Sequence, residues 1–242
     1  MNNTVKPYQE EGSKKKQVSQ MFDKIAPFYD LLNRVLSLGI DVSWRKKMIK
    51  MMKQKNPKTI LDVATGTADV AIETAKQISP DQIKGIDISS KMIEIGRKKI
   101  EKNKLSQVIQ LDIGDSENLD FEDQSFDAIT VAFGVRNFEN LEKGLKEMQR
   151  VLKKGGEMYI LEFSHPTVFP FKQIFNAYFK YILPTIGKLT SKDPKAYKYL
   201  YESVQAFPNG PQFDKILKEL GFNNTKFIPL TLGICTIYVG EK

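Results

Sequence analysis

The chain has 242 residues, 41% of them hydrophobic and 27% charged, a composition that is typical of a globular protein and argues against a disordered one. Its net charge of +8 permits attraction to anionic surfaces, but it selects neither nucleic acid nor lipid. The single cysteine, Cys235, excludes an internal disulfide and a cysteine-rich metal cluster, and we expect no bound metal. No apolar run approaches the roughly 20 residues that span a bilayer. We therefore expect a cytoplasmic protein, with any membrane contact peripheral at the inner face.

The first 54 residues are predicted to form a helical cap. Apolar residues recur there at helical spacing, and Pro27 and Gly39 interrupt the pattern. Tyr29 and Asp30 have two interpretations: they face a substrate, or they are a packing tyrosine and a helix cap.

From Thr59 onward, short β-branched runs alternate with amphipathic stretches, which is the pattern of a mostly parallel sheet with crossover helices. The predicted strands are 59–64, 83–87, 108–112, 126–133 and 157–163. The predicted helices are 69–77, 91–102 and 141–152, the last of them closed by the Lys-Lys-Gly-Gly sequence at 153–156. We expect an α/β fold in a single domain, residues 1–242.

Two further segments follow the fifth predicted strand. Residues 164–210 are expected to form a helical insertion, in which aromatic and aliphatic side chains recur at intervals of three and four: Phe171, Phe175, Tyr178, Phe179 and Ile182. This stripe is core, a channel for an apolar chain, or a contact with a membrane interface. The segment FIPLTLGICTIYV near the C-terminus predicts two strands joined tightly at Leu232-Gly233, which adds an antiparallel edge to the sheet.

Ligands of open α/β sheets bind beyond the carboxyl ends of the strands, so the first strand exit is a candidate site. It reads DVATGTAD, and small residues around Gly66 and Thr67 let the backbone approach a ligand before a helix begins. Ala64 and Ala68 stand where glycines are more usual. Alone, this segment fits a nucleotide-like ligand and a plain strand-to-helix turn equally well.

The next two strand exits carry acidic residues. Asp87 follows Gly66 by roughly 20 residues, the spacing at which a carboxylate accepts ribose hydroxyls. Its alternative role is a helix cap, which Ser89 or Ser90 can also fill. Asp115 and Ser116 follow the third strand, where they either read the edge of an adenine or form a polar turn. Together the three exits predict an adenosine ligand, and both NAD and S-adenosylmethionine satisfy them.

The chain resembles the ubiquinone/menaquinone biosynthesis C-methyltransferase family from Val18 to Val239. The resemblance rests on FDKIAPFYDLLNRVLSLGID, ILDVATGTADVA, GIDISSKMIEIG, GDSENLDF, SFDAITVAFGVRNF, RVLKKGGEMYILEFS and LPTIGKLTSKDPKAYKYLYESVQAFP. It implies the class I methyltransferase fold, a Rossmann-like, mostly parallel sheet of seven strands, and S-adenosylmethionine as cofactor. It also implies methylation of a ring carbon of a prenylated quinol. Demethylmenaquinol is the expected acceptor, and a benzoquinol of the ubiquinone pathway is the alternative.

The resemblance also assigns roles to residues. It places the methionine and ribose parts of the cofactor near Thr67 and Asp87, and the adenine near Asp115 and Ser116. Ala132 stands where some members carry serine, which removes a side-chain hydrogen bond to the cofactor.

Arg136 and Asn137 are the predicted catalytic residues, because the resemblance places FGVRNF beside the acceptor. A phenolic ring carbon becomes nucleophilic when the neighbouring hydroxyl loses its proton, and arginine stays protonated and cannot be the ordinary base. Our hypothesis is that Arg136 stabilises the phenolate, through a water that carries the proton, while Asn137 orients the ring. The alternative for Arg136 is a surface ion pair. His165 replaces a more familiar lysine and receives no role.

Three other functions compete with this interpretation. A nucleic-acid methyltransferase would suit the charge, but the Asn/Asp-Pro-Pro-aromatic segment is missing after the fourth strand, so nucleic acid is not an expected partner. An NAD oxidoreductase fits that segment less well than a methyltransferase does. A non-catalytic scaffold of quinone biosynthesis would bind the cofactor without turnover. The expected partners are the prenylated quinol and, as a homodimer or a complex, a second copy or other quinone-biosynthetic enzymes.

Overall fold

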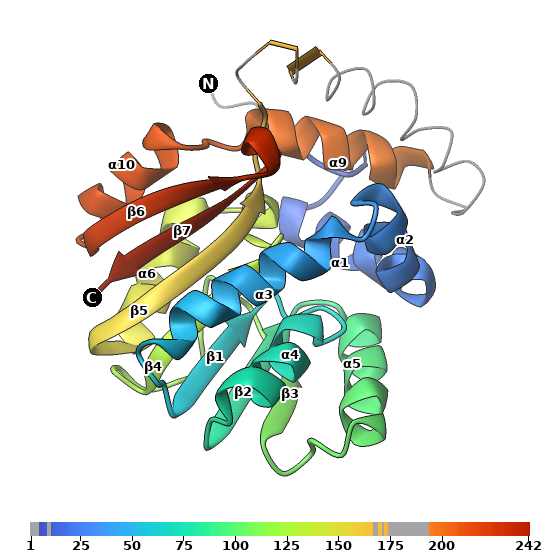
Figure 1. Ribbon diagram of the computed structural model, residues 1–242. Coiled ribbons are helices and arrows are strands. Elements are labelled where there is room, and N and C mark those ends of the chain that lie inside the picture. The colour runs from blue at the N-terminus through green and yellow to red at the C-terminus, as the bar shows by residue number, and fades with distance from the viewer. Residues whose placement is uncertain (1–4, 9–10, 167–168, 171, 174–193) are drawn as a thin grey trace.

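A computed structural model describes residues 5–8, 11–166, 169–170, 172–173 and 194–242. Seven strands form one sheet in the order β3-β2-β1-β4-β5-β7-β6 (Figure 1). The strands are β1 (Thr59–Val63), β2 (Gln82–Asp87), β3 (Ile109–Ile113), β4 (Phe126–Ala132), β5 (Leu152–Phe163), β6 (Asn223–Leu230) and β7 (Cys235–Glu241). The first five run parallel, and β7 runs antiparallel to both of its neighbours. This confirms the predicted fold class.

The helices are α1 (Lys14–Ile25), α2 (Tyr29–Leu36), α3 (Ile40–Lys53), α4 (Asp69–Ile78), α5 (Ser90–Lys102), α6 (Leu141–Val151), α9 (Pro194–Ala206) and α10 (Pro211–Glu219). Short 3-10 turns are η1 (Ala26–Phe28), η2 (Val135–Asn137) and η4 (Thr231–Gly233). No described helix is both long and apolar enough to cross a membrane.

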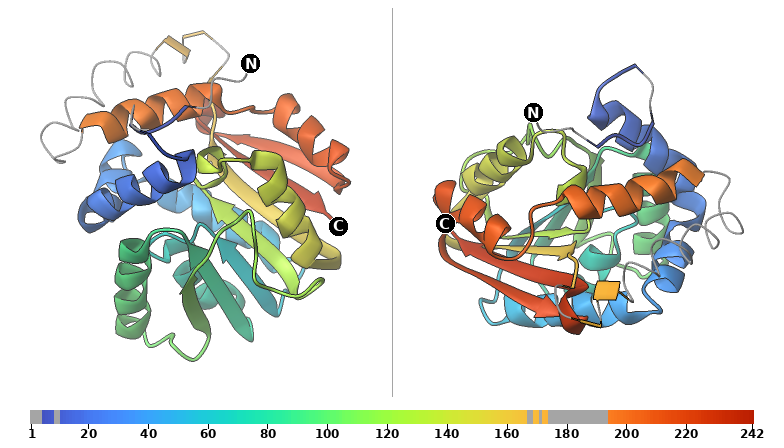
Figure 2. Two further views of the ribbon diagram at one scale, coloured as in Figure 1. Left: turned by 180° about the vertical axis from the view of Figure 1, so that it is seen from behind. Right: turned by 90° about the horizontal axis from the view of Figure 1, so that it is seen from above.

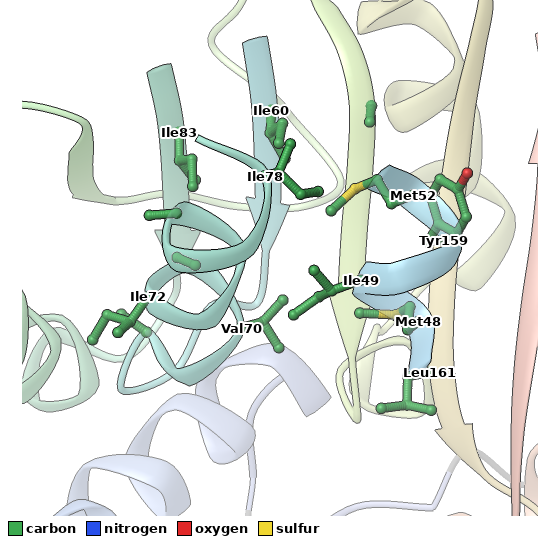
Figure 3. Packing of buried hydrophobic residues seen from close by; sticks show 14 of the residues in the cluster. Met48, Ile49, Met52, Ile60, Val70, Ile72, Ile78, Ile83, Tyr159 and Leu161 are labelled. Carbon is green, nitrogen blue, oxygen red and sulfur yellow. The ribbon is translucent and has the colours of Figure 1, made fainter. Parts of the chain in front are cut away.

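Two apolar layers sandwich the sheet, because side chains of each strand alternate between its faces. Ile60 of β1 belongs to the layer under α3 and α4, where Met48, Ile49 and Met52 are fully buried (Figure 3). Leu61, the next residue, belongs to the opposite layer, with side chains of α6 and α10. Burial on both faces fixes the register of the sheet and hence the positions of its strand exits.

The strand order reverses at β1, since the chain builds β2 and β3 on one side of it and β4 on the other. The carboxyl ends of β1, β2 and β4 therefore meet at the topological switch point, where a ligand is expected. In Figures 1 and 2, α1, α2 and α9 gather beyond these strand ends. The helical additions before and after the sheet thus cover its carboxyl edge.

One predicted boundary is wrong. The helix over 141–152 ends at Val151 as expected, but β5 begins at once at Leu152 rather than at 157. Leu152 pairs with Phe126, and the register then shifts before Ala128. Gly155 has the positive φ expected of a helix-closing glycine, yet it lies inside the irregular start of β5. The Lys-Lys-Gly-Gly sequence therefore forms part of a strand irregularity instead of a helix cap.

The other boundaries agree closely with the structure. The first four predicted strands and the three predicted helices match within one residue at each end. The tight connection at Leu232-Gly233 is η4, where both residues have positive φ. α9 provides a helix within the predicted insertion, whereas the aromatic stripe over 171–182, apart from residues 172–173, lies outside the described residues.

Candidate functional site

A cleft opens beyond the carboxyl ends of β1, β2 and β4. Counting its open mouth, it encloses about 640 Å³, within the roughly 300–1,000 Å³ range of small-molecule sites. Five of the predicted site residues line it: Gly66, Asp87, Asp115, Ser116 and Asn137. Thr67 lines a smaller pocket next to it, and Gly66, Ala132 and Phe133 belong to the walls of both. The cleft and the smaller pocket together form one candidate cofactor site.

The loop between β1 and α4 has left-handed backbone at three alternate positions. Gly66 has φ +56°, and Ala64 and Ala68 have φ +52° and +66°. Glycine adopts this conformation freely, whereas a residue with a Cβ does so at a cost of about 1–2 kcal/mol. This conformation explains why glycine is more usual at the two alanine positions.

Asp87 lies buried at the end of β2. Its carboxylate accepts hydrogen bonds from the backbone N–H of Gly66 at 2.9 Å and of Ser89 at 2.8 Å. Burial raises the pKa of Asp87 to about 6. The side chain of Ser89 caps α5 by accepting from the N–H of Met92, so Asp87 is not needed as the cap. An ionised carboxylate has about four acceptor positions, so these two bonds leave acceptor capacity for a ribose hydroxyl.

The loop after β3 is held by a lysine that the sequence did not single out. Lys15, in the first turn of α1, donates to Asp115 at 2.6 Å and to Glu117 at 3.2 Å. Glu117 is buried and also accepts from the backbone of Glu139 and Asn140. The only sequence signal for this contact is a run of three lysines in a segment with few other features, which resembles any solvated surface.

The start of α2 lies over the cofactor loop. Asp30 accepts from the hydroxyl of Thr67 at 2.5 Å and from Lys99 at 2.8 Å. The ring of Tyr29 lies 3.7 Å from the point that a Cβ on Gly66 would occupy, and Tyr29 lines both pockets. Both residues therefore contact the predicted cofactor site.

Arg136 and Asn137, both in η2, differ in where they point. Asn137 lines the cleft; its amide donates to the Phe133 carbonyl at 3.3 Å and accepts from the Tyr199 hydroxyl at 3.1 Å. Among the described residues, Arg136 is not in the wall of either pocket. Its guanidinium donates to Glu162 and to the Phe133 carbonyl, each at 2.6 Å. Arg136 therefore lies behind Asn137 instead of in the open cleft.

The pair of Arg136 and Glu162 is buried, with side-chain exposures of 7% and 0%, so it is not a surface ion pair. Burial raises the pKa of Glu162, and the charge of Arg136 opposes the shift. The Nε of Arg136 is buried without a hydrogen-bond partner among the described residues. One polar donor at this end of the site is thus left unsatisfied, which is costly unless a ligand or water accepts from it.

Ala132 and His165 differ from the family pattern, and neither side chain offers the cofactor a hydrogen bond within the described pocket walls. Ala132 lines both pockets with its methyl group, so the side-chain hydrogen bond that a serine would offer is missing at that point. His165 contacts the Asn209 amide at 2.8 Å and lies outside the described walls of the two pockets.

The donor set fits S-adenosylmethionine. A buried carboxylate stands where the sequence predicts the ribose, a polar loop stands where it predicts the adenine, and the apolar residues Ile86, Ile88 and Met92 line the same cleft. Fold and site together define a class I S-adenosylmethionine-dependent methyltransferase.

A family model described as the ubiE/COQ5 methyltransferase family matches residues 10–242, and the chain belongs to this family. It is 51% identical over 238 residues to a demethylmenaquinone methyltransferase of Bacteroides fragilis, covering 98% of this chain and 97% of the relative. It is 49% identical to a ubiquinone/menaquinone biosynthesis C-methyltransferase of Geotalea daltonii, covering 95% and 97%. These relatives confirm the resemblance and exclude NAD as the cofactor.

Solved structures share the fold at low identity. A putative S-adenosyl-L-methionine-dependent methyltransferase of Methanococcus maripaludis superposes with a TM-score of 0.56 at 23% identity, covering 97% of each chain. A putative O-methyltransferase of Nostoc punctiforme gives 0.66 at 12% identity, covering 91% of this chain and 60% of the other. The seven-stranded methyltransferase fold is therefore confirmed.

Proposed function

We propose that the protein transfers the methyl group of S-adenosylmethionine to a ring carbon of demethylmenaquinol. The observation that carries the proposal is the 51% identity, over nearly the full length of both chains, to the demethylmenaquinone methyltransferase of Bacteroides fragilis. The site supports it, because a polar pair at the β4 exit adjoins a cofactor cleft with aromatic walls.

Cofactor binding falls to the three strand exits. We assign the ribose hydroxyls to Asp87, the adenine edge to Asp115 and Ser116, and the methionine part to the loop of Gly66 and Thr67. When bound, S-adenosylmethionine supplies the electrophilic methyl group, so the chain itself has to bind, align and exclude water. Tyr29, packed over Gly66, serves the last of these tasks.

Activation of the quinol falls to the β4 exit. The ring carbon needs electron density from a deprotonated neighbouring hydroxyl, and a positive charge in a dry site stabilises that oxygen. Arg136 supplies the charge from behind Asn137, and its unpartnered Nε is a donor for a water that carries the proton between the oxygen and this end of the site. Asn137, held on both sides of its amide, orients the ring.

Arg136→Ala tests the role of the charge. We expect turnover to be lost while S-adenosylmethionine still binds, measured by transfer of a radiolabelled methyl group and by calorimetry. Because this variant leaves Glu162 buried and unpaired, the double variant Arg136→Ala/Glu162→Gln is measured beside it to separate chemistry from folding. Unchanged turnover in the folded double variant would remove Arg136 from the mechanism.

A benzoquinol of the ubiquinone pathway is the second candidate, since the relative in Geotalea daltonii carries both quinones in its name. Radiolabelled S-adenosylmethionine, offered with demethylmenaquinol and with the demethoxy-type benzoquinol in turn, distinguishes them. We expect label on demethylmenaquinol. Cofactor binding with no label on either acceptor would instead favour a scaffold.

A further inference from the structure

Exposed apolar side chains gather on the N-terminal helices. In the described part of the chain, seven large apolar side chains are strongly exposed, and four of them lie within thirteen residues of one another: Phe28, Leu31, Leu38 and Ile40. Their exposures run from 38% to 78%. Single exposed apolar residues are common on soluble proteins, but a cluster marks a surface that meets a partner.

The end of the sheet extends this cluster. The indole of Trp44 in α3 donates to the hydroxyl of Thr231 at 2.8 Å, which fixes η4 against the first half of α3. Leu232, the next residue, is 62% exposed. Seen from above in Figure 2, η4 and α3 lie on the same side of the molecule. We call Phe28, Leu31, Leu38, Ile40 and Leu232, with the outer side of α3, the basic apolar face.

Positive charge is concentrated in the same segment. Residues 24–55 hold eight lysines and arginines against two aspartates, a net +6 of the +8 that the whole chain carries. Both aspartates are engaged, Asp30 with Lys99 and Asp41 with two arginines. Three of the eight cations pair with acids outside the segment: Arg45 with Asp69, Lys46 with Glu73 and Lys55 with Glu157. On α3, Lys46, Lys47 and Lys50 are exposed, because the opposite side of the helix is buried in the core.

Aromatic side chains join this face to the cleft. Trp44 packs against Phe163 and Phe133, with ring centroids 6.2 and 6.4 Å apart. Phe133 lines both pockets, and Arg136 lies over the ring of Phe163. Buried aromatic packing therefore connects the first half of α3 with the β4 exit, where the two residues assigned to the acceptor ring lie.

We propose that the basic apolar face docks on an anionic lipid bilayer, and that the lipid-soluble acceptor enters the cleft from that side. The second half of the proposal rests on the proposed function; the first half does not. Basic residues near an anionic membrane each contribute about 1 kcal/mol, and exposed apolar side chains add insertion into the headgroup region.

A bilayer fits this face better than two other occupants do. Nucleic acid would use the lysines but would gain nothing from exposed Leu31 and Leu38, since phosphate contacts dominate such binding. A second copy would bring two faces of like charge together in a symmetric contact. Anionic lipid satisfies both the charge and the apolar side chains at once.

Vesicle flotation with the full-length protein tests the docking, using phosphatidylcholine alone and phosphatidylcholine with phosphatidylglycerol. We expect binding only to the anionic vesicles, and weaker binding as salt rises. Lys47→Glu/Lys50→Glu is expected to raise the half-saturating lipid concentration at least about tenfold. The matched control, Lys215→Glu/Lys218→Glu on α10, makes the same charge change elsewhere and is expected to bind almost as the parent does.

The apolar component is tested with Leu31→Ser/Leu38→Ser, which is expected to lose binding that survives high salt. The control is Ile113→Ser, which removes a similarly exposed side chain at the end of β3. Equal binding to neutral and anionic vesicles, or equal loss in both lysine pairs, would overturn the proposal. Concentration-dependent dimerisation abolished by Leu31→Ser/Leu38→Ser, with no lipid binding by the parent, would assign the face to a second copy.

The outcomes separate this proposal from the proposed function, because flotation needs neither cofactor nor quinol. Vesicle binding with no methylation of either quinol would leave the docking face standing and reject the acceptor. Methylation of a short-tailed quinol in detergent, with no vesicle binding, would support the acceptor and reject the docking face. If both hold, Leu31→Ser/Leu38→Ser is expected to slow methylation of a long-tailed quinol in vesicles and to leave the detergent assay unchanged.

Discussion

The cofactor end and the acceptor end of the site are built in different ways. At the cofactor end, the proposed binding residues lie at strand exits, and Asp87 is held by the backbone N–H groups of Gly66 and Ser89. Lys15 of α1 and Asp30 of α2 contact these loops from outside the sheet. At the acceptor end, Arg136 depends on Glu162 of β5, and Asn137 depends on Tyr199 of α9. The positions of the cofactor-end residues directly after strands are visible as spacing in the sequence. The acceptor end joins distant segments through these pairs, so we expect removal of one member to disturb its partner as well.

The largest expected effect is on the acceptor end. Glu162→Ala leaves the buried charge of Arg136 unpaired, and we expect the free energy of unfolding to fall by about 3–5 kcal/mol. Chemical denaturation measures it. Glu219→Ala, which removes an exposed partner of Lys215, is the control and is expected to change stability very little. If Glu162→Ala lowers the free energy of unfolding only slightly, the acceptor end does not depend on the pair of Arg136 and Glu162.

The cofactor end is expected to lose affinity instead of stability. Asp87→Asn removes the charge of the proposed acceptor of the ribose hydroxyls, and we expect the Kd for S-adenosylmethionine to rise about 100-fold, or about 3 kcal/mol. Titration calorimetry provides the measurement. Asp112→Asn changes an exposed carboxylate of the neighbouring strand and is expected to leave Kd unchanged. If both variants bind alike, the ribose is not held by Asp87.

The same carboxylate predicts a pH dependence. The pKa of Asp87 is raised to about 6, so the side chain becomes protonated as pH falls through 6 and loses acceptor capacity. Affinity for S-adenosylmethionine is therefore expected to fall by about tenfold per pH unit below 6, and Asp87→Asn should flatten this profile. The effect on stability has the opposite sign: stability is expected to fall as pH rises from about 4, the ordinary pKa of the carboxyl, to the folded-state pKa of about 6, and to stay level above it. Asp62, buried with a pKa of about 6, contributes to stability in the same direction.

A smaller effect is expected at the link between the acceptor end and α9. Tyr199→Phe removes one hydrogen bond to Asn137, and we expect kcat to fall about fivefold, equivalent to about 1 kcal/mol, with the cofactor Kd unchanged. Tyr238→Phe removes a comparable bond to the Gly210 N–H and is expected to keep kcat. A parallel fall in kcat for both variants would show a general packing effect.

The smallest effect concerns the loop after β1. Ala64→Gly relieves a left-handed alanine but makes the unfolded chain more flexible, so we expect stability to change by less than about 1 kcal/mol. Thermal unfolding with and without S-adenosylmethionine measures it. A large stabilisation would show that the loop stores more strain than its φ angles imply.

This difference also explains what the sequence could and could not predict. Strands and helices of the sheet followed from periodicity, because burial on both faces dictates an apolar pattern. Gly66, Asp87 and Asp115 followed from their positions after strands. Lys15, Glu162 and Tyr199 had no such signal, because their partners lie 26 to 100 residues away and only the fold brings them together. The start of β5 was not predicted, because a glycine with positive φ occurs both at helix ends and in strand irregularities. Gly155 has this conformation within β5.

The contacts of α1 and α2 with the cofactor loops have a consequence for the release of the spent cofactor. Lys15 bonds the residue assigned to the adenine, and Asp30 bonds the residue assigned to the methionine. Because these bonds tie α1 and α2 to the loops at both ends of the proposed cofactor site, we expect that they must break before spent cofactor leaves. Departure of S-adenosylhomocysteine, and not methyl transfer, is then the step expected to limit the steady state, and added salt is expected to speed it.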